Sequence, residues 1–225
     1  MVKYTLLAGI LSATALLAAP KAENTLTGGV VIEADPCQPN GPVDVMTDER
    51  GVTAVDAANG SVIYRFEGEW LRKTAACGNT ALALTDKHLL FYSQDTGRWL
   101  VQAVVQSDQV IGVTRGYNFS LGRDMAVFAT LNEAWFFRGA KKLVHISFSG
   151  DRLRGVAAFG DAGCIVTDRR TYCLGSKSET GRIYELSDMH IRNMRALSGK
   201  IIMRAPEKTL IYFPDRDQYE FTPQR

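Results

Sequence analysis

The chain has 225 residues, of which 46% are hydrophobic and 22% are charged, with 20 glycines and seven prolines. This composition excludes a disordered chain, a collagen-like repeat and a small disulfide-dense scaffold. The formal net charge is only +2 and the charged residues are scattered, so the sequence does not favour binding to nucleic acid or to an anionic membrane surface.

The first 22 residues have the pattern of a secretory signal peptide. Lys3 precedes an uncharged apolar stretch at residues 4–19, which is followed by small residues and Pro20. The stretch is shorter than the roughly 20 apolar residues that a membrane-spanning helix needs. We therefore expect an exported protein, periplasmic or secreted, with cleavage after residue 18, 19 or 22. A retained anchor is the alternative, and no membrane span is expected in the mature chain.

The four cysteines are more often paired than free in an exported chain. Cys164 and Cys173 are equally distant from the centre of a predicted two-residue turn. In such a hairpin they lie directly opposite each other at a non-hydrogen-bonded pair, where a cross-strand disulfide can form. A second bridge between Cys37 and Cys77 then follows by elimination. Two buried thiols without a bridge are the alternative.

A weak repeat of about 40 residues runs through the chain. Each unit has an apolar strand, a turn that begins with Thr, a second strand, a loop that ends in Gly, and an aromatic strand. The equivalent turn positions are Thr47, Thr85, Thr130, Thr167 and Ala205, at spacings of 38, 45, 37 and 38 residues. A further alternating stretch follows each aromatic strand, as at residues 110–116, 152–160 and 190–199, and we interpret it as the fourth strand of its unit.

Four short strands in each of five units predict an all-β fold, a five-bladed β-propeller of four-stranded blades that forms a single domain over residues 23–225. The last unit stops at Phe221 after its third strand. We expect residues 25–34 to supply the missing strand, so that the N-terminal strand closes the ring and removes an open sheet edge. A β-sandwich is the alternative fold, and residues 125–137 also have the composition of a helix.

One unit resembles a known repeat. Residues 52–66, VTAVDAANGSVIYRF, resemble a repeat of the pyrroloquinoline-quinone-like propellers, whose units carry Asp-Ala and then a Thr-Gly or Asn-Gly turn before an aromatic strand. DTGRW from Asp95 and ETGRIY from Glu179 are similar. The resemblance implies a propeller architecture. It does not imply dehydrogenase activity, because the chain is shorter than the cofactor-binding quinoproteins, so no cofactor is expected and envelope scaffold proteins are the nearer analogy.

Three carboxylates, Asp48, Asp86 and Asp168, each follow a Thr at a predicted turn. A propeller places them on one face, where they could form a cation site, but Asp at such a place more often bonds the turn backbone. The three histidines fall at non-equivalent positions of the repeat, and the chain has no zinc-binding or hydrolase motif. We therefore expect neither a metal site nor catalytic residues.

The longest spacing, 45 residues, places about seven extra residues between the second and third units, at residues 115–124. We expect this insertion to be a loop on the same face as the Gly loops at residues 95–98 and 138–142. Its aromatic and arginine content is typical of recognition surfaces. The predicted ligand-binding residues are Arg115, Tyr117, Asn118, Phe119, Arg123 and Asp124. Loop-length drift without a function is the alternative.

The sequence thus favours an exported propeller that binds a protein, a glycan or another envelope or extracellular ligand through its loop face. The first alternative is a propeller enzyme that acts on a glycan or small molecule in the central channel. Two or more carboxylates that converge with a His or Arg at the channel mouth would favour this alternative. A purely structural component of the envelope is the second alternative.

Overall fold

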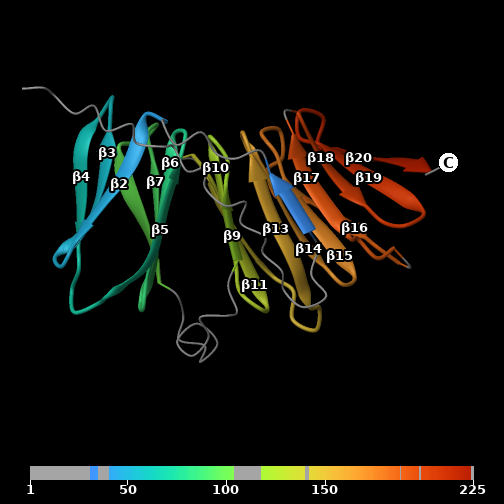
Figure 1. Ribbon diagram of the computed structural model, residues 1–225, viewed down its shortest axis with the longest axis horizontal. Coiled ribbons are helices and arrows are strands. Elements are labelled where there is room, and N and C mark those ends of the chain that lie inside the picture. The colour runs from blue at the N-terminus through green and yellow to red at the C-terminus, as the bar shows by residue number, and fades with distance from the viewer. Residues whose placement is uncertain are drawn as a thin grey trace, which may run out of the picture.

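The computed structural model describes residues 31–34, 41–103, 118–139, 142–187, 189–197 and 199–223. These residues form strands and turns, and no helix among them is long and apolar enough to cross a membrane. The strands make five separate sheets that lie side by side in the order of the chain (Figure 1). The fold is therefore all-β and propeller-like, as predicted, and the alternative of a two-layer β-sandwich is wrong.

The first sheet has three strands and each later sheet has at least four. The first consists of β2 (Val43–Asp48), β3 (Gly51–Asp56) and β4 (Gly60–Arg65). The second consists of β5 (Leu71–Cys77), β6 (Thr80–Thr85), β7 (His88–Ser93) and β8 (Arg98–Ala103). The third consists of β9 (Asn118–Leu121), β10 (Met125–Ala129), β11 (Glu133–Arg138) and β12 (Lys142–Ser147).

The fourth sheet consists of β13 (Leu153–Phe159), β14 (Ala162–Thr167), β15 (Arg170–Leu174) and β16 (Arg182–Glu185). The fifth consists of β17 (Asn193–Leu197), β18 (Lys200–Arg204), β19 (Lys208–Phe213) and β20 (Gln218–Pro223), with β1 (Val31–Ala34) added to β17. Within each sheet, strands that follow one another in the chain pair antiparallel. Residues 125–137 therefore contain β10 and most of β11, and not a helix.

The prediction assigned the fourth strands to the wrong sheets. The stretches at residues 152–160 and 190–199 contain β13 and β17, which are the first strands of the following sheets rather than the last strands of the preceding ones. The reason is that each of them is joined by a tight turn to the strand after it, and a tight turn fixes antiparallel pairing. Residues 110–116 lie outside the described residues. As a result, the first sheet begins with a strand equivalent to the second strand of the other sheets.

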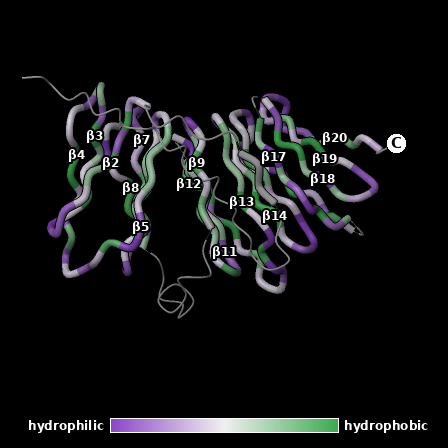
Figure 2. The backbone as a smooth tube through the Cα atoms, in the orientation of Figure 1, coloured by the Kyte–Doolittle hydropathy of each residue, from purple (hydrophilic) through white to green (hydrophobic). Residues whose placement is uncertain are grey.

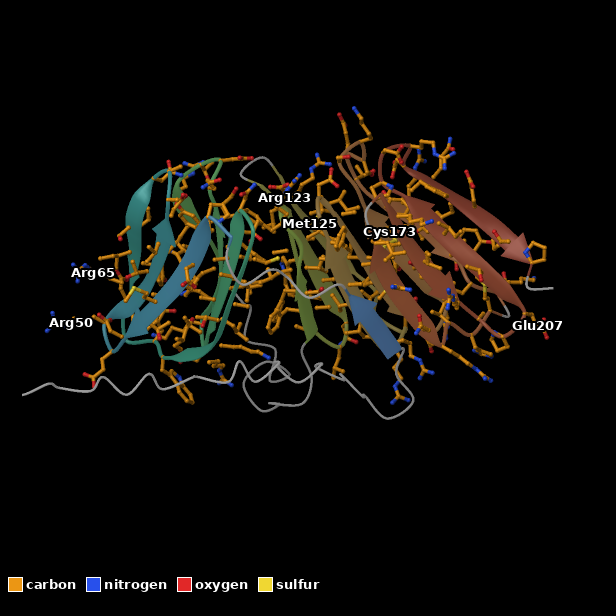
Figure 3. All side chains as sticks on the ribbon, turned by 45° about the horizontal axis from the view of Figure 1, so that its top comes forward. Arg50, Arg65, Arg123, Met125, Cys173 and Glu207 are labelled. Atoms are coloured by element: carbon orange, nitrogen blue, oxygen red, sulfur yellow. A yellow bond between two sulfur atoms is a disulfide. The ribbon has the colours of Figure 1, made fainter. Side chains whose placement is uncertain are left out.

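The N-terminal strand joins the last sheet, as predicted, but it pairs in parallel with β17 at the edge opposite β20. The expected ring closure was wrong for the described residues. Their apolar clusters join each sheet to the next, and no cluster combines residues of the first and fifth sheets. The first and fifth sheets lie at opposite ends of the molecule in Figures 1 and 3. The five sheets thus form an open row.

The Thr turns confirm the register of the repeat. The hydroxyl groups of Thr85, Thr130 and Thr167 each lie within hydrogen-bond distance of the carbonyl oxygen three residues later, at 3.2, 3.4 and 3.0 Å, and accept the N–H of that same residue. These hydroxyls therefore satisfy turn backbone groups that burial would otherwise leave without partners. Thr47 is exposed, and Ala205 has no hydroxyl, so the two terminal sheets lack this bond.

The core lies between neighbouring sheets. Every residue of β6, β10 and β14 is buried, because each of these strands has a partner strand on both edges and a sheet on both faces. The largest buried side chains include Tyr92, Tyr212, Phe91 and Phe128. Figure 2 shows hydrophilic segments at the turns and hydrophobic segments along the strands between the sheets. Continuous apolar strands, rather than strict alternation, are the sequence pattern of such two-sided burial.

The predicted hairpin disulfide is confirmed. Cys164 and Cys173 are directly opposed in the pairing of β14 with β15, with their Cα atoms 4.1 Å apart, and they form a disulfide. Cys77, at the end of β5, is also disulfide-bonded. Its predicted partner, Cys37, lies outside the described residues, so the pairing of Cys37 with Cys77 stays a prediction.

The Asp-Ala and Asn-Gly positions of the quinone-like repeat connect the first two sheets. The buried Asp56 carboxylate accepts hydrogen bonds from the Ala58 N–H (2.8 Å), Asn59 Nδ2 (2.7 Å), Tyr92 OH (2.7 Å) and Gln94 Nε2 (2.8 Å). Burial raises the pKa of Asp56, but these hydrogen bonds outweigh it and hold the pKa well below its ordinary value. The resembling residues thus have a structural role here.

Candidate functional site

The predicted recognition loop is divided in the structure. Arg115 and Tyr117 lie outside the described residues. Asn118 and Phe119 belong to β9, which pairs with β10, and Arg123 and Asp124 lie in the turn at the other end of this strand. The described part of the insertion is therefore a strand and a turn rather than one loop. Ligand binding by these residues stays a prediction.

Phe119 is a packing residue in the structure. Its half-buried ring packs against the apolar cluster between the second and third sheets, and the Lys73 Nζ lies 4.4 Å from the ring centroid. Phe119 and Leu121, two residues apart on β9, both face this cluster. The sequence did not reveal this alternation because the strand is only four residues long. Phe119 thus contributes to the interface between two sheets.

The turn after β9 ties three sheets together. The Asp124 carboxylate accepts from Asn79 Nδ2 at 2.6 Å and from Arg123 Nε at 2.8 Å, and the Asp124 N–H donates to the Gly160 carbonyl at 2.7 Å. The hydrogen bond to Asp124 raises the pKa of Arg123. Figure 3 labels Arg123 near the middle of the row. The turn therefore has a positioning role, with one exposed guanidinium.

The three aspartates of the Thr turns bond backbone groups. The Oδ1 atoms of Asp86 and Asp168 accept the N–H groups of Trp70 and Arg152, both at 2.9 Å. Asp48 Oδ1 accepts an N–H of its own turn at 2.7 Å. All three therefore bond backbone groups, but only Asp48 bonds its own turn as expected, whereas the partners of Asp86 and Asp168 lie 16 residues earlier in the chain. In the described ranges, no group of three or more His, Cys, Asp or Glu residues is arranged to hold a metal ion.

Glu69 is the centre of a polar cluster that sequence reasoning missed. Its side chain is fully buried and accepts from Thr85 Oγ1 at 2.5 Å and Tyr64 OH at 2.8 Å, with His88 Nδ1 at 2.9 Å. Burial raises the pKa of Glu69, but the hydrogen bonds from Thr85, His88 and Tyr64 outweigh it, so the pKa is lowered. Burial and the adjacent carboxylate raise the pKa of Tyr64. The cluster is a buried, hydrogen-bonded anion.

A second buried carboxylate lies at the equivalent place in the fourth sheet. Asp151 Oδ2 accepts from Thr167 Oγ1 at 3.2 Å, and Asp151 also pairs with Arg169 and Arg170 at 3.7 and 3.8 Å. In both sheets the carboxylate precedes its Thr by 16 residues. This common spacing was the available signal in the sequence, and it indicates a repeated structural role rather than a single catalytic dyad.

The candidate binding site is a groove of about 620 Å³ in the fourth and fifth sheets, at the end where the β18–β19 turn lies. Four chain segments form it: the end of β16, the connection from β16 to β17, the turn from β18 to β19, and β20. Its lining includes Tyr184, Met189, His190, Glu207, Lys208 and Phe221. Figure 3 labels Glu207 at this end of the molecule.

The groove combines an aromatic wall with a charged rim. The rings of Tyr184 and Phe221 meet edge to face with their centroids 5.1 Å apart, and Phe221 is 48% exposed. Met189 is buried beside them, whereas His190, Glu207 and Lys208 are exposed. Apolar walls with a few polar groups at the edge are the usual composition of a ligand pocket, and the volume lies within the usual range.

Comparison with known proteins finds similar solved structures but no family. No protein-family model matches the chain, and no curated protein matches it. Similar solved structures include human WBSCR16, with 8% identity, 76% of this chain and 59% of that chain covered, and a TM-score of 0.43. Hsv2p of Kluyveromyces lactis has 8% identity, coverages of 77% and 59%, and a TM-score of 0.41. Apo AztD from Citrobacter koseri has 11% identity, coverages of 77% and 52%, and a TM-score of 0.40.

The chain thus spans between 52% and 59% of the length of these three structures. At such identities and TM-scores the similarity carries no argument about this chain. The five sheets and their strand order, taken from the chain itself, define a protein of the β-propeller type. The resemblance to pyrroloquinoline-quinone-like repeats stays a prediction, because no family model supports it.

Proposed function

We propose that the protein is an exported scaffold that binds a polypeptide ligand in the groove between the fourth and fifth sheets. The observation that carries the proposal is the groove itself, with about 620 Å³ of space beside a half-exposed aromatic ring. The N-terminal signal pattern and the disulfide between Cys164 and Cys173 support export, because disulfides persist in oxidising compartments. The groove lies at the end of the sheets that carries the Thr-type turns, whereas the sequence analysis expected the binding face at the Gly loops beside residues 115–124.

The lining favours a polypeptide over a small anion or a nucleotide. Phe221 and Tyr184 offer an apolar surface on which an aromatic or aliphatic side chain can pack. Glu207 and Lys208 place charges of both signs at the rim, so neither an anionic nor a cationic ligand has a net electrostatic advantage. An apolar anchor side chain within a polar segment fits this arrangement, which resembles the apolar centre and polar rim of protein interfaces.

The test is selection of peptides from a random displayed library on the mature protein. We expect the selected peptides to share an aromatic or aliphatic anchor. Phe221→Ala should weaken their binding by about 2 kcal/mol, or about thirtyfold in Kd, because a central aromatic contact is lost. Leu131→Ala is the matched control, since Leu131 is 44% exposed in the third sheet, away from the groove. Equal binding by the two variants would contradict the proposal.

An enzyme that acts in a central channel stays the alternative to this proposal. The carboxylate and imidazole of Glu69 and His88 are the nearest approach to a catalytic pair in the described residues. We assign this pair a structural role, because Asp151 anchors the equivalent Thr without a histidine.

A further inference from the structure

Among the described residues, the first sheet has no strand at the place where the first strand of each later sheet lies. By the repeat, β2 is equivalent to β6, β10 and β14, which each pair with a strand on both edges. Among the described residues, β2 pairs only with β3. In the other sheets, the place beside the second strand is occupied by β5, β9, β13 or β17, always antiparallel. In the described part of the chain, the edge of β2 is therefore open, and its hydrogen-bonding groups suit an antiparallel strand.

The exposure of β2 shows the effect of this open edge. Four of its six residues are exposed, whereas β6, β10 and β14 are entirely buried. Met46 is 64% exposed, although its equivalent in the second sheet, Leu84, is fully buried. Met46 lies in one cross-strand row with Thr53 and the exposed Ile63. Two exposed apolar side chains, Met46 at the open edge and Ile63 on β4, thus lie on either side of Thr53 on the outer face of the sheet.

The backbone at this edge uses substitute partners. The register of β2 with β3 and the bond from the Ala57 N–H to the Pro42 carbonyl direct the N–H groups of Val43, Val45 and Thr47 away from β3. The Val43 N–H donates to the Gly78 carbonyl at 3.2 Å. The Val45 N–H donates to the side chain of its own neighbour, Asp44, at 2.7 Å. On a strand edge that has a neighbouring strand, such N–H groups donate to the backbone carbonyls of that strand instead.

We propose that the open edge of β2 is a strand-addition site for an extended segment of a partner polypeptide. The segment would run antiparallel along β2, as the first strand does in each other sheet, and pair with its six residues. Residues 35–40, just before β2, include two prolines, which have no N–H to donate to such a ladder. The proposal rests on the first sheet alone and is independent of the groove at the other end of the molecule.

The charges on β2 indicate the composition of the segment. Asp44 and Asp48 are exposed on the edge strand itself, whereas the nearest basic side chain of the sheet's strands, Arg65, lies on β4, two strands away. Arg50 lies in the turn between β2 and β3, and Figure 3 labels both arginines at this end of the molecule. The edge thus favours a segment in which basic residues alternate with apolar ones. β5 in the second sheet, LRKTAAC, combines two basic residues with apolar ones, although its basic residues are adjacent.

The probe is a synthetic peptide with the sequence of residues 71–77 and the change Cys77→Ser, labelled for fluorescence anisotropy and added to the mature chain. Thr47→Pro removes a ladder donor at an exposed position, where edge strands tolerate proline, and Thr47→Ala is its matched control. Asp44→Asn keeps the Oδ1 acceptor and removes the charge. We expect Thr47→Pro to weaken binding by at least about tenfold, Asp44→Asn by about threefold at low salt, and Thr47→Ala not at all.

Hydrogen exchange gives a second measurement on the unmodified protein. Bound peptide should slow exchange of the Val45 and Thr47 amides, and a peptide with methyl groups on the backbone nitrogens that face β2 should neither bind nor protect. Binding of the methylated peptide at unchanged affinity would overturn the proposal, and so would a wild-type chain that does not bind the peptide at about 1 mM. Self-association of the chain with protection of these amides would instead make a second copy the occupant, which also contradicts the proposal.

Discussion

The second and fourth sheets contain the same hydrogen-bonded anchor with different side chains. In both, a buried carboxylate bonds the Thr at the end of the second strand, and the following Asp bonds the backbone 16 residues earlier. The equivalent pairs, 82 residues apart, are Glu69 and Asp151, Trp70 and Arg152, Thr85 and Thr167, Asp86 and Asp168, and His88 and Arg170. The same geometry with different partners indicates that the anchor serves the fold.

The partners of the two carboxylates suggest unequal contributions to stability. Glu69 has three close partners that are buried or half-buried. Asp151 has one hydrogen bond at 3.2 Å and two long ion pairs to Arg169 and Arg170, whose side chains reach solvent. We expect Glu69→Ala to lower the free energy of unfolding by about 3 kcal/mol, because it leaves several polar groups without a partner. Asp151→Ala should cost about 1 kcal/mol, since exposed arginines can be hydrated.

Urea denaturation of both variants measures this difference. Wild type and the exposed-site variant Leu131→Ala are the controls. Equal losses of stability in Glu69→Ala and Asp151→Ala would break the comparison, because they would show that partner geometry does not decide the energy.

The disulfide distinguishes the same two sheets. Leu82 and Phe91 oppose each other in the second sheet at the positions that Cys164 and Cys173 occupy in the fourth. Replacing both cysteines by Ala should lower stability by about 2.5 kcal/mol, because the bridge closes a short loop in the unfolded chain. Calorimetry of the oxidised protein and of the double variant measures the effect. An unchanged melting temperature would mean that the buried packing of this strand pair suffices without the bridge.

The third sheet lies between the two compared sheets, and Phe119 on β9 helps to join it to the second. Phe119→Ala should lower stability by about 1.5 kcal/mol, because a half-buried ring loses its contacts with the cluster between these sheets. Arg123→Ala, at an exposed side chain of the neighbouring turn, should cost less than about 1 kcal/mol. Thermal melting of both variants is the measurement. If Phe119→Ala melted like wild type, the original interpretation of this residue as part of a binding loop would regain support.

The pH dependence of stability gives the smallest of these effects. The folded-state pKa of Glu69 is lowered, so its stabilising effect is fully present above the pKa of a Glu in the unfolded chain and is lost as pH falls through the lowered folded-state value. The stability gap between wild type and Glu69→Gln should therefore narrow between pH 7 and pH 3. Urea midpoints at a series of pH values measure it, with Leu131→Ala as the control, and a gap that is constant over this range would contradict the lowered pKa.

The sequence predicted correctly those features of the fold that are set within one hairpin. The Thr turns and the hairpin disulfide at Cys164 and Cys173 follow from spacing within one pair of strands, and both are confirmed. The sheet to which a strand belongs was not predicted correctly. Residues 152–160 alternate equally well whether the strand pairs with the preceding or the following hairpin, and only the tight turn after β13 decides between them.

The sites were harder to predict than the fold. Glu69 and Asp151 precede a strand in a polar stretch, which is typical of exposed residues, and their burial depends on a Thr 16 residues later. The groove draws its lining from four segments between Tyr184 and Pro223, none of which has a motif of its own. Aromatic and arginine content drew attention to residues 115–124 instead, although Phe119 is aromatic because it packs between sheets.

The parallel pairing of β1 with β17 affects how the molecule folds. Val31 pairs with Asn193, so the first described strand meets its partner 162 residues later in the chain. The second, third and fourth sheets are built from consecutive strands and can form as the chain emerges in the N-to-C direction. Contacts between distant parts of a chain slow folding, because a long loop must close before they form. We therefore expect the fifth sheet to be completed last, because β1 cannot pair with β17 until most of the chain has been synthesised.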